Sequence, residues 1–130
     1  MNVKLAGAST LVVIAISVPA FAHHSFSMFD QEKTVTMKGT VKELEWTNPH
    51  SWLRVMIVDQ ATGKAMQWAF EMGPPAAQIG RGWKPDSLKP GDTVTMNIHP
   101  LKDGSRGGQL VNATLPDGRT VGGAGAPRIQ

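Results

Sequence analysis

One stretch of the chain constrains the fold more than any other, because its apolar and polar residues alternate and then change phase. Residues 34–46 alternate, and up to Val41 they do so with the period of a β-strand that has one buried face. The phase then shifts by one residue, as a β-bulge produces, and Gly39 would let the strand bend. A long, bent first strand is what a small closed barrel needs to join its two sides. The apolar positions are Val35, Met37, Gly39 and Val41, and then Leu44 and Trp46.

Four later segments also alternate, and Pro, Gly or Asp residues bound each of them. The segments are residues 51–59, 65–71, 93–99 and 109–115. The short turn between the first two predicts an antiparallel hairpin. After Pro74 and Pro75, residues 76–79 predict a short helix.

The predicted order is therefore three antiparallel strands, a short helix and two further strands. This is the element order of an OB-fold, an all-β, five-stranded Greek-key barrel. An immunoglobulin-like sandwich would require about seven strands. We expect one core built from the inward positions of the second, third and fourth strands. These positions are Leu53, Val55, Ile57, Met66, Trp68, Phe70, Val94, Met96 and Ile98.

The first 22 residues have the pattern of a secretory signal peptide. Lys4 supplies a positive start, residues 5–18 are apolar or small, and Ala20-Phe21-Ala22 offers the small residues that a signal peptidase recognises. The alternative is an uncleaved anchor, because the apolar stretch is nearly long enough to span a bilayer. We expect cleavage after Ala22 and a periplasmic or secreted protein with no membrane span after processing.

The processed chain then divides into three parts. Residues 23–33 form an N-terminal segment, residues 34–121 the OB-like barrel, and residues 122–130 a tail rich in Gly, Ala and Pro that is expected to be disordered.

Composition and motifs exclude several classes of function. The chain has no cysteine, so disulfides, thiolate metal sites and cysteine nucleophiles are absent. A formal net charge of +3 is too small to indicate nucleic-acid binding, and export argues in the same direction. There is neither a Gly-x-Ser-x-Gly motif nor a phosphate-binding loop. Ser25 and Ser51 each follow a histidine, but neighbouring strand residues point to opposite faces. We therefore name no catalytic residue and expect a non-enzymatic protein.

The four histidines are candidate metal ligands. His23 would open the processed chain, and its α-amine and ring nitrogen together can chelate one metal ion, with His24 adjacent. His50 lies before the second strand, and His99 ends the fourth. Such a nitrogen-rich set suits copper or zinc. The alternative is that His23 and His24 are a polar start and that His50 and His99 cap turns.

Trp52 and Arg54 form a candidate face for a ligand or a partner. Both lie opposite the apolar face of the second strand, so Trp52 could stack on a flat ligand. The alternative is that Trp52 packs under the N-terminal segment with Phe26 and Phe29.

The chain resembles an uncharacterised family of small exported bacterial proteins, domain of unknown function six-one-five-two. The resemblance implies export and a small β-barrel, brings no established activity, cofactor or partner, and favours His23, His24 and His50 over His99. The matching stretches are His23-His24-Ser25-Phe26, Phe29-Asp30, Gly39-Thr40-Val41, Trp46-Thr47-Asn48-Pro49-His50, Trp68-Ala69-Phe70-Glu71, Arg81-Gly82-Trp83, Leu88-Lys89-Pro90-Gly91-Asp92, Lys102-Asp103-Gly104 and Leu115-Pro116-Asp117-Gly118-Arg119.

These observations lead to one expected function and two alternatives. We expect an exported small binding protein that holds a metal ion, with copper as the candidate cofactor, through its N-terminal histidines. The first alternative is a structural or partner-binding accessory protein without metal, whose partner is a periplasmic protein or a small ligand. The second is a copper-dependent oxidase.

Overall fold

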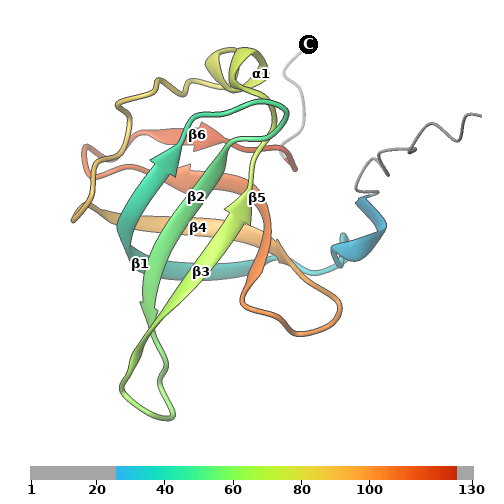
Figure 1. The fold of residues 1–130 in the computed structure, drawn as a ribbon, viewed down its shortest axis with the longest axis vertical. Helices are drawn as coiled ribbons and strands as arrows, with labels where there is room; N and C mark the ends of the chain where they lie inside the picture. Colours follow the sequence, from blue (N-terminus) through green and yellow to red (C-terminus); the bar gives the residue numbers. More distant parts are fainter. Residues whose placement is uncertain (1–25, 126–130) are drawn as a thin grey trace, which may run out of the picture.

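The computed structural model describes residues 26–125, in which strands predominate (Figure 1). A 3-10 helix at Phe26–Met28 comes first, and one short α-helix lies between the third and fourth strands. The elements are β1 (Val35–Glu45), β2 (Trp52–Val58), β3 (Ala65–Glu71), α1 (Pro75–Ile79), β4 (Thr93–Pro100), β5 (Gly107–Thr114) and β6 (Thr120–Gly122).

Strand β1 belongs to both sides of the barrel. Its first half pairs with β4, from Val35 opposite Ile98 to Thr40 opposite Thr93. Its second half pairs with β2, and the register shifts between Val41 and Glu43, so the predicted change of phase is a bulge. Gly39 lies where one partner gives way to the other. A Cβ at Gly39 would come within 2.8 Å of the Met56 carbonyl oxygen, so only glycine allows this close approach.

A parallel pairing closes the barrel. The strand order is β3-β2-β1-β4-β5-β6, and β3 also pairs with β5 over Ala69–Glu71 and Gly107–Gln109. Five strands thus form a closed mixed barrel with α1 between β3 and β4, which confirms the predicted OB-like fold. In Figure 1 the α1 end lies opposite the β2–β3 hairpin.

The barrel interior contains most of the predicted core. Leu53, Val55, Phe70, Val94, Met96 and Ile98 are buried in one cluster, and Ile57 and Trp68 pack against it. Met66 is only half-buried and lies outside the cluster, because it stands in the hairpin beyond the closed part of the barrel. Residues from outside the predicted strands, notably Met72, Trp83 and Leu88, complete the cluster.

The C-terminal part of the chain is hydrogen-bonded to the sheet beyond residue 121, where the sequence predicts that the barrel ends. Strand β6, which was not predicted, pairs with β5, and Gly123 and Gly125 donate backbone hydrogen bonds to Val111 and Leu110. The boundary expected at Gly122 therefore falls inside a bonded segment. The proposed signal peptide, His23, His24 and residues 126–130 lie outside the described residues. Between residues 26 and 125, no helix is both long and apolar enough to cross a membrane.

Candidate functional site

A row of four polar or aromatic side chains crosses the outer face of the barrel. Glu71 of β3 pairs with Trp52 of β2 on one side and with Gln109 of β5 on the other, and Gln109 pairs with His99 of β4. Directly paired residues point to the same face of a sheet. The next positions along these strands belong to the buried core, so this row, which we call the outer row, points away from the core.

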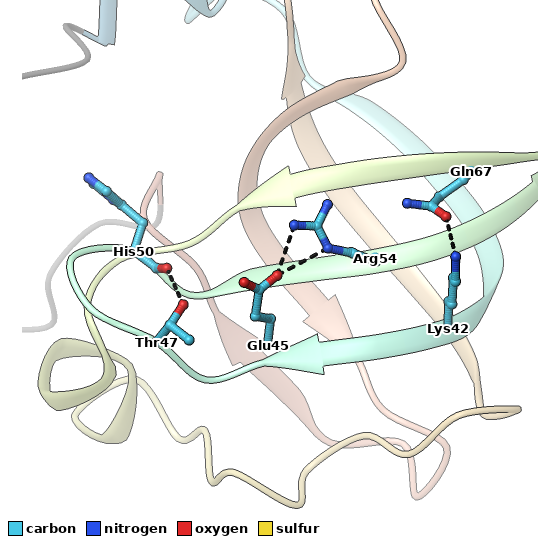
Figure 2. A network of polar contacts seen from close by, with 6 residues as sticks. All are labelled: Lys42, Glu45, Thr47, His50, Arg54 and Gln67. Atoms are coloured by element: carbon cyan, nitrogen blue, oxygen red, sulfur yellow. Dashed lines mark hydrogen bonds and ion pairs between the residues drawn. The ribbon is translucent and has the colours of Figure 1, made fainter.

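His50 lies beside one end of the outer row. Its Nδ1 is 3.1 Å from Oε1 of Glu71 and 3.3 Å from the Met72 carbonyl oxygen. Because both neighbours accept hydrogen bonds, Nδ1 carries the proton and Nε2 of the neutral ring keeps a lone pair. The Glu71 side chain is 6% exposed and that of His50 34%. Figure 2 shows the ring directed away from the neighbouring polar contacts, while the Thr47 hydroxyl donates to the His50 carbonyl at 2.9 Å.

His99 lies at the other end of the outer row, under the N-terminal segment. Its Nδ1 is 2.7 Å from the Lys33 carbonyl oxygen, so this nitrogen also donates and leaves Nε2 available. Three backbone contacts fix the segment here. Phe29 forms a β-bridge with Leu101, Asp30 N–H donates to the Pro100 carbonyl, and Lys102 N–H donates to the Met28 carbonyl.

An ion pair reinforces the N-terminal segment. The Lys33 ammonium lies 3.1 Å from the Asp30 carboxylate, and this hydrogen bond lowers the pKa of Asp30 below its ordinary value. The Asp30 charge is thus retained to lower pH than that of a free aspartate.

Both ends of the described chain cover the middle of the outer row. Gln31 Nε2 donates to Oε1 of Gln109 at 2.9 Å, and Gln109 is only 1% exposed. On the C-terminal side, a Cβ at Gly125 would lie 3.2 Å from that same oxygen and 3.1 Å from Cδ2 of His99. The sequence alone does not mark Glu71 and Gln109 as members of the outer row. They occupy outward positions of alternating strands, and only contacts with distant segments bury them.

The described part of the chain offers individual imidazole nitrogens as metal ligands, not a complete metal site. Residues 26–125 contain no group of three or more His, Cys, Asp or Glu side chains that could hold a metal ion. His50 lies beside Glu71 of the outer row and His99 is the last member of that row, and each holds its Nδ1 against an oxygen atom. This orientation is typical of metal-ligating histidines, in which the second ring nitrogen donates to a carboxylate or carbonyl.

Trp52 and Arg54, the candidate ligand face, are engaged within the chain. The Arg54 guanidinium lies 6.0 Å from the centre of the half-buried Trp52 ring, at the distance of a cation–π contact. Its Nε and Nη2 donate to one oxygen of Glu45, at 3.1 and 2.8 Å, as Figure 2 shows. Phe29, which the alternative interpretation places with Trp52, forms its β-bridge with Leu101, just beyond the end of β4. A ligand at Trp52 would therefore have to displace Arg54 first.

Comparison with known proteins gives a family and no closer relative. No curated protein and no solved structure matches the chain. The model of a family of unknown function, DUF6152, matches residues 10–111, which include β1 to β4 and the first half of β5. The chain therefore belongs to the DUF6152 family.

Proposed function

We propose that the protein is an exported, non-enzymatic binding module that holds one copper ion between its processed N-terminus and His99. In this proposal the α-amine and ring of His23 form a chelate, His24 is available beside it, and Nε2 of His99 adds a ligand from the barrel. The observation that carries the proposal is the position of His99 beside the N-terminal segment, which favours His99 over His50 as the further ligand although the family resemblance favours His50. Nδ1 of His99 donates to the N-terminal segment, which leaves Nε2 without a partner within residues 26–125.

Chain length permits this arrangement. Phe29 is bridged to Leu101, two residues beyond His99, and His23 precedes Phe29 by six positions. Three of these steps lie in the 3-10 helix, which rises about 2 Å per residue, and an extended chain covers about 3.3 Å per residue, so His23 can lie up to roughly 16 Å from Phe29. The whole end of β4 falls within that radius. Nitrogen ligands favour Cu(II) over the other divalent first-row ions.

Export is the first requirement of the proposal. We expect the protein recovered from the periplasm of a Gram-negative expression host to begin at His23, because Ala20-Phe21-Ala22 forms the cleavage site. Intact-mass measurement of the recovered protein checks this. A protein that retains Met1, or that stays in the cytoplasm, would contradict both export and the amine chelate.

Copper binding is the second requirement. Removing a residue that only hydrogen-bonds to a metal ligand lowers metal affinity roughly 10- to 100-fold. His99 is a direct ligand in this proposal, so we expect His99→Ala to weaken Cu(II) binding at least about tenfold. An alanine inserted before His23 should weaken it as well, since it moves the amine away from the chelate. Calorimetric titration of untagged, processed protein measures both effects, and we expect one copper ion per chain.

His50→Ala is the matched control, because it also removes one half-exposed imidazole beside the outer row. It should leave copper affinity within about twofold of the parent, a difference below 0.5 kcal/mol. Equal copper affinity with and without the added alanine would rule out the amine chelate. Absence of copper binding in every version would instead favour the partner-binding accessory protein.

A further inference from the structure

A groove at the hairpin end of the barrel has no role in the copper proposal. It runs between the start of β1, the β2–β3 hairpin and the β4–β5 loop, and its volume is about 820 Å³. Figure 1 shows this hairpin reaching beyond the barrel on the side opposite α1. Ligand pockets for small molecules typically measure about 300–1,000 Å³. The residues that line the groove include the apolar side chains of Val35, Met66 and Trp68 and the basic side chains of Lys38 and Arg106.

The groove exposes apolar surface because the barrel closes along only part of β3. Strand β3 pairs with β5 from Ala69 to Glu71, so Ala65–Trp68 have no partner strand on that side. Met66 and Trp68 are consequently half-buried. Val35, at the start of β1, also lines the groove and is 41% exposed.

The charged groups at this groove are mainly basic. Lys38 and Arg106 line it together with one acid, Asp59. Within the described part of the chain, neither cation has an ion-pair partner. Arg106 also lines an adjoining hollow of about 510 Å³ that shares Trp68 with the groove. An unpaired guanidinium beside an indole ring and a thioether suits a ligand with an anionic end and an apolar body.

We propose that this groove binds a small amphipathic anion, with an apolar body of ring size and a carboxylate or sulfonate group. The apolar body packs against Met66 and Trp68, and the anionic group pairs with Arg106. Along β3, Trp68 of the groove lies three positions before Glu71, about 10 Å from the outer row, and Trp68 lies on the opposite face of the strand from Glu71. The groove is therefore distinct from the proposed copper site.

The test uses anilinonaphthalene sulfonate, a fluorescent aromatic anion, on metal-free processed protein. We expect saturable binding of one probe per chain, with energy transfer from tryptophan to the probe. Arg106→Glu removes a charge-assisted contact and should weaken binding about tenfold or more. Met66→Gln removes apolar contact and should also weaken binding. The uncharged analogue phenylnaphthylamine should bind more weakly than the sulfonate to the parent protein.

Two matched variants separate the groove from general effects. Lys84→Glu makes the same change of charge at an exposed residue outside the groove, and Ile79→Ser removes apolar surface at a residue that is 61% exposed on α1. Both should bind the probe like the parent, and thermal melting of every variant establishes that it is folded. The proposal is overturned if Arg106→Glu and Lys84→Glu weaken binding equally. It is also overturned if Met66→Gln has no effect, or if the folded parent does not bind the probe.

Discussion

Replacing Val55 with aspartate is expected to unfold the domain. Val55 lies in the middle of β2, is 0% exposed, and belongs to the core cluster. A carboxylate there would be buried without a partner, which costs several kcal/mol or more. Because the free energy of unfolding of a domain of this size is only about 5–15 kcal/mol, this single change removes most of it. Circular dichroism and size-exclusion chromatography should show a loss of the cooperative melting transition.

Val58→Asp is the natural control for this substitution. It introduces the same charge in the same strand, at a residue that is 52% exposed. We expect its free energy of unfolding to stay within about 0.5 kcal/mol of the parent. A Val55→Asp protein that melts cooperatively near the parent temperature would contradict the assignment of the core.

Trp83→Ala should have the second largest effect. Trp83 is 1% exposed although it lies in an irregular segment, and its indole N–H donates to the Gly122 carbonyl. Removing a buried tryptophan side chain costs about 3–5 kcal/mol. Denaturation by urea, followed by circular dichroism, measures this loss. Hydrogen exchange should rise first at Gly122 and Gly123, because Trp83 holds this segment against the barrel.

Trp83→Phe separates the loss of buried apolar volume from the loss of the hydrogen bond to Gly122. Phenylalanine keeps much of the apolar volume but cannot donate to the Gly122 carbonyl, so we expect a smaller loss, of about 1–3 kcal/mol. If Trp83→Ala left both stability and exchange unchanged, the irregular segment would not be part of the core.

The sequence predicted those features whose cause is local. Alternation identified β1 to β5 within about two residues, and the change of phase after Val41 located the bulge. Pro74 and Pro75 marked the start of α1 correctly. In each case the pattern lies within one element, so it can be recognised without knowing the rest of the fold.

The features that were missed depend on distant segments. Strand β6 spans three residues and ends at glycine, which is too short for a period. Trp83 gains its burial from the core and from Gly122, which neighbouring residues do not reveal. In the site, His50 and His99 were found from their residue type and their positions at strand ends. Their oxygen partners, Glu71 and the Lys33 carbonyl, emerge only from strand register and from the path of the N-terminal segment.

The double pairing of β1 has a consequence for how quickly the chain can fold. The first half of β1 requires β4, which is synthesised only after β2, β3 and α1. Closing so long a loop costs conformational entropy before the stabilising β1–β4 contacts can form. Topologies dominated by such distant pairings fold slowly. A chain emerging from the ribosome thus cannot complete its barrel until β5 has followed. A barrel that closes this late leaves the chain without its complete core until its last long strand is available.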